Sequence, residues 1–106
     1  MSRVIKFRAW GTRVQRMYFN IEAKSNFVDY LDDSSFRVMQ FTGLHDKNGK
    51  EIYEGDILQY DFLPEGSDQR SEVIFKNGKF CIEDGNNYMP SGEVIGNIYQ
   101  NPELLK

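Results

Sequence analysis

Few side chains in this chain have catalytic or ligand-binding potential. His45 is the only histidine and Cys81 is the only cysteine. A histidine base needs a pocket, and we expect His45 to be exposed beside a turn, opposite Glu51. Cys81 stands between Phe80 and Ile82, which predicts a buried and inert thiol, because a reactive thiol needs nearby cations or a helix N-terminus. The sequence therefore predicts no catalytic residue.

The acidic residues do not form a recognisable metal site. Asp29, Asp32 and Asp33 are close in sequence, but the ligand spacing of an EF-hand is absent, so we expect a solvated acidic segment. The chain also has no zinc-ligand spacing, no Walker loop and no glycine-rich dinucleotide motif. We expect a protein that is not an enzyme and that needs neither a cofactor nor a metal.

The amino-terminal strand has the one pattern with a functional interpretation. Lys6, Arg8 and Trp10 alternate with three apolar residues at positions 5–9, and a period of two predicts a strand with one buried face and one basic, aromatic face. Such a face could hold phosphates and stack a base. The candidate contacts to nucleic acid or another partner are Arg3, Lys6, Arg8, Trp10, Arg13 and Arg16.

A structural alternative explains the same pattern without nucleic acid. Lys6 and Arg8 would form a solvated face that pairs with acids from later strands, while Trp10 would be buried. We favour this alternative because 16 acidic and 13 basic residues give a net charge of -3. A nucleic-acid-binding domain is expected to have a broad positive surface.

Length and composition limit the remaining possibilities. The 106 residues fit one domain, and an aromatic share of 14% favours strands over disorder. One cysteine excludes an intrachain disulfide, and neither a signal peptide nor an apolar stretch long enough to cross a membrane is visible. We expect a reducing, intracellular location and no membrane partner.

The turn signals divide the chain into short strands. We expect a hairpin between the first strand and residues 17–19, then a short helix capped by Ser25-Asn26, a loop at 32–35 and a strand over 37–42. Further on we expect a mobile loop over 61–71, a loop over 83–92, a strand over 93–99 and a helical turn that begins at Asn101-Pro102. Gly55 predicts a bulge or a sharp bend.

The segment from Met39 to Tyr60 predicts a β-hairpin whose register can be argued. A two-residue turn at Asn48-Gly49 would set like charges opposite each other. A type I turn with Gly49 in the left-handed conformation uses one more loop residue and avoids this repulsion. The cross-strand pairs of that register are Asp46–Lys50, His45–Glu51 and Leu44–Ile52.

A second hairpin is expected over residues 73–82. Its two-residue Asn77-Gly78 turn stacks Phe75 on Phe80 and Val73 on Ile82, and this apolar pairing outweighs one exposed lysine pair. The residues expected to have a structural role in turns and bends are Asp46, Asn48, Gly49, Gly55, Asn77 and Gly78.

Three blocks of sequence, in order, resemble the YopX family of phage and prophage proteins. The blocks are Ile5–Trp10, the run from Met39 to Ile57, and Glu93–Tyr99 followed by Asn101–Leu105. The resemblance implies a phage-encoded protein in the host cytoplasm and a mainly β fold with a barrel-like carboxyl-terminal part. It implies no activity and supplies no catalytic or binding residues.

These observations predict a mainly β protein, β-rich α+β at most. We expect one YopX-like domain over 1–106, with a hairpin and a variable segment over 1–36 and a barrel-like core over 37–106. The core would be a small, strongly bent antiparallel sheet, SH3-like in part, with a short carboxyl-terminal helical turn.

The predicted function is a non-catalytic protein-interaction or assembly module in the bacterial host cytoplasm. Self-association could use strand edges or the apolar loop residues Phe62, Leu63 and Met89. The alternative is an accessory protein that binds nucleic acid through the basic amino-terminal strand.

Overall fold

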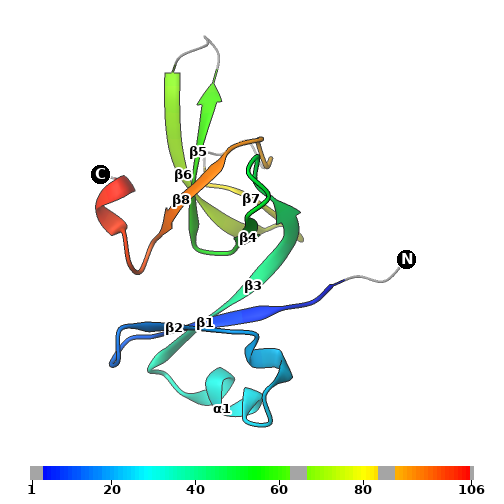
Figure 1. Cartoon of the computed structure of the whole chain (residues 1–106), viewed down its shortest axis with the longest axis vertical. Helices are drawn as coiled ribbons and strands as arrows, with labels where there is room; N and C mark the ends of the chain where they lie inside the picture. Colours follow the sequence, from blue (N-terminus) through cyan, green and yellow to red (C-terminus); the bar gives the residue numbers. More distant parts are fainter. Residues whose placement is uncertain (1–3, 63–66, 84–87, 106) are drawn as a thin grey trace.

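The computed structural model describes residues 4–62, 67–83 and 88–105, and it confirms the expected mainly β fold. Two four-stranded antiparallel sheets lie one above the other in Figure 1. The strand order of the first sheet is β2-β1-β3-β4. Its strands are β1 (Phe7–Gly11), β2 (Arg16–Phe19), β3 (Phe36–His45) and β4 (Glu51–Tyr53).

The second sheet contains the later strands in the order β7-β6-β5-β8. These strands are β5 (Asp56–Phe62), β6 (Ser67–Lys76), β7 (Lys79–Ile82) and β8 (Glu93–Asn97). The described helices are a 3-10 turn η1 (Ile21–Ala23), the helix α1 (Phe27–Asp32) and a 3-10 turn η2 (Pro102–Leu105). The short helix after Asn26 and the terminal helical turn are as expected, although the Asn26 side chain makes no capping hydrogen bond.

Both faces of β1 are covered, which corrects the expectation of a solvated basic face. One face packs on η1 and α1, below the sheet in Figure 1, through Ala9, Ile21 and Tyr30. The other face turns toward the second sheet, so Arg8 and Trp10 are each only 5% exposed. Ile5 lies before the strand begins and is 56% exposed, so its expected burial was wrong.

The β3–β4 hairpin has the expected turn but an unexpected bulge. Gly49 has a φ of +84°, and His45 pairs with Glu51 as predicted. The expected Leu44–Ile52 pair does not form, because the register shifts between His45 and Phe41. Gly43, with a φ of +87°, lies within this shift, and Leu44 is 45% exposed while Ile52 is 2% exposed.

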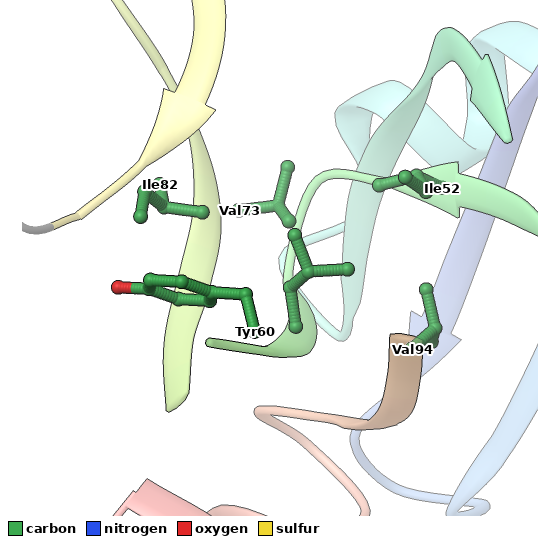
Figure 2. Packing of buried hydrophobic residues seen from close by; sticks show 6 residues of the cluster. Ile52, Tyr60, Val73, Ile82 and Val94 are labelled. Atoms are coloured by element: carbon green, nitrogen blue, oxygen red, sulfur yellow. The ribbon is translucent and has the colours of Figure 1, made fainter. Parts of the chain in front are cut away.

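The chain passes from the first sheet to the second at Gly55. This glycine has a φ of +85°, and a Cβ at this position would lie 3.0 Å from the sulfur of Met39. A sharp bend was expected here, and its consequence is that β4 and β5 belong to different sheets. Ile52 of β4 therefore reaches the core of the second sheet, where Figure 2 shows it beside Val73 and Val94.

One hairpin of the second sheet is as expected, and the other is longer than the sequence indicates. Phe75 pairs with Phe80 and Val73 pairs with Ile82, which confirms the register of the Asn77-Gly78 turn. The expected loop over 61–71 was wrong, since β5 and β6 pair as far as Phe62 and Ser67. Asp61, Gln69 and Arg70 are exposed, and a hairpin arm that extends beyond the core needs no alternating apolar pattern.

Asp46 fixes the first hairpin to the second sheet. Its Oδ1 accepts hydrogen bonds from the backbone N–H groups of Asn48 and Lys50, both at 2.8 Å, and its Oδ2 accepts one from Val94 of β8 at 2.9 Å. Burial by itself raises the pKa of Asp46, but these donors and the charge of Lys50 outweigh it and hold the pKa below its ordinary value.

Replacing Asp46 tests this attachment. We expect Asp46→Ala to lower the free energy of unfolding by about 2–3 kcal/mol at neutral pH, because a buried backbone donor loses a charged acceptor. Since the folded pKa is depressed, the stabilisation is present above the ordinary carboxyl pKa and is lost as the pH falls through the folded pKa. Urea unfolding across the acidic range measures this effect.

The control for this experiment is Asp61→Ala, which removes an exposed carboxylate of β5. We expect little change in stability from it. A deficit in Asp46→Ala that stays constant through the acidic range would contradict the assignment.

Candidate functional site

Residues of both sheets line a cleft of about 550 Å³. Apolar and polar residues of five strands, Lys50 just before β4 and the segment after β8 surround it. Its lining, which we call the inter-sheet cleft, consists of Arg8, Met17, Phe19, Lys50, Glu51, Tyr53, Asp56, Val94, Ile95, Gly96, Asn97, Gln100 and Asn101. The volume is within the range of small-ligand sites and is enough for a few side chains of a partner.

A buried ion pair joins the two sheets at this cleft. The Arg8 guanidinium of β1 donates through Nη2 to Asp56 Oδ1 of β5 at 2.7 Å and to the Glu54 carbonyl at 3.2 Å. The two side chains are 6% and 3% exposed. The second carboxylate oxygen of Asp56 accepts a hydrogen bond from the Tyr53 N–H at 2.8 Å, so this carboxylate also closes the turn between β4 and β5.

The charges of this pair are strongly affected by burial. Burial raises the pKa of Asp56, while the Arg8 charge and the Tyr53 N–H oppose the rise. The Arg8 Nε is buried without a hydrogen-bond partner among the described residues, and the guanidinium lies over the Tyr53 ring, 4.6 Å from its centroid. Because the two charges cancel, the pair is a structural link and leaves little charge to attract an anion.

Tyr53 forms the aromatic wall of the inter-sheet cleft. It is 3% exposed, and it contacts Phe19 edge-on at 6.2 Å and Phe41 at 5.5 Å between ring centroids. Burial and the nearby charge of Glu51 raise the pKa of Tyr53 to about 12. The phenol therefore keeps its proton at physiological pH, so it can donate a hydrogen bond but cannot act as a base.

The amide side chains of Asn97 and Asn101 at the cleft rim form hydrogen bonds within the protein. Asn97 Oδ1 accepts hydrogen bonds from the backbone N–H groups of Tyr99 and Gln100, and Asn97 Nδ2 donates to Gln100 Oε1 at 2.7 Å. Asn101 Oδ1 accepts one from the Asn97 N–H at 3.2 Å. These bonds hold the segment after β8 against that strand and shape the rim.

The structure does not assemble the basic face that the sequence suggested. Lys6 forms an ion pair with Glu51, and Arg8 forms one with Asp56, so both cations pair with acids from later strands. Trp10 is buried and stacks on Tyr99. Arg13 and Arg16 are exposed near the β1–β2 turn, and Arg3 lies outside the described residues.

The other chemically reactive residues lie apart from the inter-sheet cleft. His45 is exposed opposite Glu51, and Cys81 is completely buried, both as expected. Asp29, Asp32 and Asp33 are exposed on α1 and just after it, and no group of three or more metal-ligating side chains is found among the described residues.

The apolar loop residues that were expected to allow self-association, Phe62, Leu63 and Met89, do not form an exposed patch among the described residues. Met89 is partly buried and packs against the core of the second sheet, so it does not form an exposed apolar patch. The Phe62 side chain and Leu63 lie outside the described residues. Within the described ranges, no helix has the length and apolarity needed to cross a membrane.

Sequence reasoning missed most of the residues that form the inter-sheet cleft. Met17 and Phe19 were recognised only as strand residues, and Asp56 only as part of a bend. The sequence signal for this site was Asp56, which follows Gly55. A carboxylate next to a sharp bend can accept a backbone hydrogen bond that closes the turn and can pair with a cation at the same time. Its partner, 48 residues away in sequence, could not be identified without the fold.

Comparisons with known proteins agree with the resemblance noted in the sequence. Residues 19–106 match the family described as YopX protein. The crystal structure of protein EF1440 from Enterococcus faecalis is 30% identical, with a TM-score of 0.75 over 99% of this chain and 100% of that chain. The structure of protein YopX from Bacillus subtilis, at 23% identity, has a TM-score of 0.65 over 95% and 98% of the two chains. A search of curated proteins gives no significant match.

Removing the Arg8 charge tests the ion pair. We expect Arg8→Met to lower the free energy of unfolding by about 3–5 kcal/mol, because Asp56 would stay buried without a compensating charge. Burial already raises the Asp56 pKa, and loss of Arg8 raises it further. A carboxyl with a raised folded pKa gains stability as the pH falls through that pKa, so the deficit should shrink in acid.

Guanidinium unfolding at several pH values measures the deficit. The variant Arg8→Met/Asp56→Asn should recover part of the loss, since the asparagine oxygen can still accept the Tyr53 N–H. Arg13→Met removes an exposed arginine and serves as the control. The pairing would be refuted if both single arginine variants cost the same.

The phenol of Tyr53 can be followed directly by ultraviolet absorbance. An alkaline titration should contain a tyrosine component near pH 12 that is missing in Tyr53→Phe. Because the folded pKa of this acid is raised, the folded protein holds the proton longer than the unfolded chain does. Stability therefore falls as the pH rises from the ordinary tyrosine value toward about 12, and less so in the variant. An unchanged high-pH component in Tyr53→Phe would contradict this.

Proposed function

Since the chain belongs to the YopX protein family, we propose that it is a phage- or prophage-encoded protein of the bacterial cytoplasm that acts by binding another protein, without catalysis. The family resemblance supports the phage origin and the compartment. The inter-sheet cleft supports the proposed binding role.

The observation behind this proposal is the combination of apolar walls and a neutral polar floor in one cleft. Phe19, which is 52% exposed, lines the cleft together with Met17 and Ile95. The Arg8–Asp56 ion pair also lines the cleft, and its two charges compensate each other. Burial of apolar side chains is the usual source of affinity in protein interfaces, and a neutral floor adds little desolvation cost.

The same features weigh against catalysis. A hydrolytic or group-transfer site needs a nucleophile or a base in hydrogen-bond reach of its substrate. The pKa of Tyr53 is raised to about 12, so this phenol keeps its proton at neutral pH. The Asp56 carboxylate already accepts hydrogen bonds from Arg8 and from the Tyr53 N–H. His45 and Cys81 do not belong to the cleft lining. Binding is therefore the better-supported role.

Nucleic acid is a less suitable partner for this surface. Two of the six cationic or aromatic contacts suggested by the sequence, Lys6 and Arg8, are used in internal ion pairs. A third, Trp10, is buried. Single-strand binding relies on a continuous positive groove with accessible aromatic rings. Arg13 and Arg16, which are exposed, provide only a small part of such a groove.

Affinity capture from phage-infected cells, with mass spectrometry and nucleic-acid detection, tests the proposed role. We expect the wild-type chain to retain a protein at moderate salt, and Ile95→Glu to lose it, because a carboxylate would enter the apolar wall of the inter-sheet cleft. Val28→Glu is the matched control, since it adds the same charge at a 63% exposed position on α1.

Three results would count against the proposal. Equal capture by Ile95→Glu and Val28→Glu would remove the inter-sheet cleft from the interface, provided both variants have the wild-type thermal stability. Retention of DNA or RNA that falls steeply with salt and is lost on replacing Arg13 and Arg16 with glutamate would favour the nucleic-acid alternative. Turnover of a substrate in a hydrolase screen would overturn the non-catalytic assignment.

A further inference from the structure

The outer side of β2 is an edge that the described residues leave open. β2 is the terminal strand of the first sheet and pairs only with β1. Apart from this pairing, the described part of the chain provides no hydrogen bond to the backbone of Met17 or Phe19. Open edges present unpaired N–H and C=O groups that can accept another strand.

The register identifies which backbone groups of β2 point outward. On the β3 side of β1, the Phe41 N–H donates to the Lys6 carbonyl and the Thr12 N–H donates to the Ser35 carbonyl. Even-numbered residues of β1 therefore face β3, and odd-numbered residues face β2. Since Ala9 pairs with Tyr18 and Gly11 pairs with Arg16, the N–H and C=O groups of Met17 and Phe19 face outward.

The other three sheet edges are at least partly covered. On β4, the Tyr53 N–H donates to Asp56 Oδ2. On β7, the Ile82 N–H donates to the Tyr88 carbonyl. On β8, the Asn97 N–H donates to Asn101 Oδ1. β2 is thus the edge best suited to receive a strand. Met17 and Phe19, whose backbone N–H and C=O groups face outward, also line the inter-sheet cleft.

The two faces of β2 have different chemistry. Met17 and Phe19 are on the face toward the inter-sheet cleft. Arg16 and Tyr18 are on the opposite face, where Arg16 is exposed and the Lys24 ammonium lies 5.4 Å from the centroid of the Tyr18 ring. A strand added beside β2 would therefore meet apolar side chains on one face and positive charge on the other.

We propose that β2 binds an extended peptide segment of a partner protein by strand addition, and that this segment alternates apolar and acidic residues. This inference rests on the proposed binding function and specifies the partner's chemistry. The apolar residues would enter the inter-sheet cleft beside Met17 and Phe19, and the acidic residues would lie near Arg16 and Lys24. Backbone hydrogen bonds to β2 would supply affinity, and the alternation would supply specificity.

A second copy of this chain fits the edge less well. Antiparallel pairing of two β2 strands keeps equivalent faces on the same side of the joined sheet. Arg16 and Lys24 of both copies would then lie on one face, and like charges across strands are destabilising. The charge pattern therefore favours an acidic partner segment over self-pairing.

A model peptide that repeats the dipeptide Val-Glu tests the proposal on the unaltered protein. When the peptide runs antiparallel to β2 with its valines toward the inter-sheet cleft, the valine N–H groups reach the carbonyls of Met17 and Phe19, while the glutamate N–H groups point away. N-methylation of the valines should weaken binding by about tenfold or more, whereas N-methylation of the glutamates should change it by about twofold or less.

Titration followed by calorimetry and by amide hydrogen exchange provides the readout. We expect the amides of Met17 and Phe19 to exchange more slowly in the complex, and a Val-Lys repeat to bind at least about tenfold more weakly than the Val-Glu repeat. The proposal is overturned if the Val-Glu peptide does not bind, if both methylation patterns have the same effect, or if the two amides are unprotected.

Substitution in β2 gives an independent test with a matched control. Met17→Pro removes an outward N–H without removing a bond to β1, whereas Met17→Ala shortens the side chain but keeps this N–H. We expect only Met17→Pro to lose hydrogen-exchange protection at Phe19. If the proline variant does not fold, the methylated peptides still decide the question.

The strand-addition proposal and the binding function can fail separately. If Ile95→Glu loses the captured partner while Met17→Pro and the Val-Glu peptide have no effect on its capture, the partner uses the inter-sheet cleft without adding a strand. If light scattering detects a dimer that Met17→Pro abolishes, the occupant is a second copy, and the acidic-segment proposal is wrong.

Discussion

The buried contact between Arg8 and Asp56 is the interaction on which the arrangement of the two sheets depends. Arg8 belongs to the first sheet, and Asp56 is the first residue of β5 in the second. The same guanidinium binds the Glu54 carbonyl, and the same carboxylate binds the Tyr53 N–H, so the pair also fixes the turn at which the chain changes sheets. An uncompensated charge at this depth would cost several kcal/mol, which makes each partner necessary to the other.

The position and chemistry of the inter-sheet cleft follow from this link. Tyr53 packs between the Arg8 guanidinium and Phe19, so the aromatic wall is held by the same residues that join the sheets. Lys6 and Arg8, which the sequence had suggested as phosphate contacts, are neutralised by internal ion pairs. Met17, Phe19 and the edge of β2 remain as the accessible part of the cleft. A folding constraint thereby determines the chemistry of the accessible surface.

Local features of the fold could be predicted from the sequence in detail, and long-range ones only in kind: Lys6 and Arg8 were expected to pair with later acids, but which acids these are could not be predicted. The Gly49 and Asn77-Gly78 turns depend on residues next to one another, and both registers were correct near the turn. The bulge at Gly43 was missed because it depends on how β3 bends between two sheets. The burial of Arg8 was missed because a period of two cannot distinguish a solvated face from one covered by a second sheet. Of the inter-sheet cleft, the sequence identified Arg8 as a candidate residue but none of the partners that surround it.

The relative orientation of the two sheets provides the most direct test of the Arg8–Asp56 link. Residual dipolar couplings of backbone amides report the orientation of β1–β3 relative to β5–β8 in solution. In the wild type, one alignment tensor should fit both sheets. In Arg8→Met/Asp56→Asn, each sheet should keep its internal couplings while their common orientation changes or becomes averaged. If a single tensor with the wild-type orientation fits the double variant, the ion pair does not set the arrangement of the sheets.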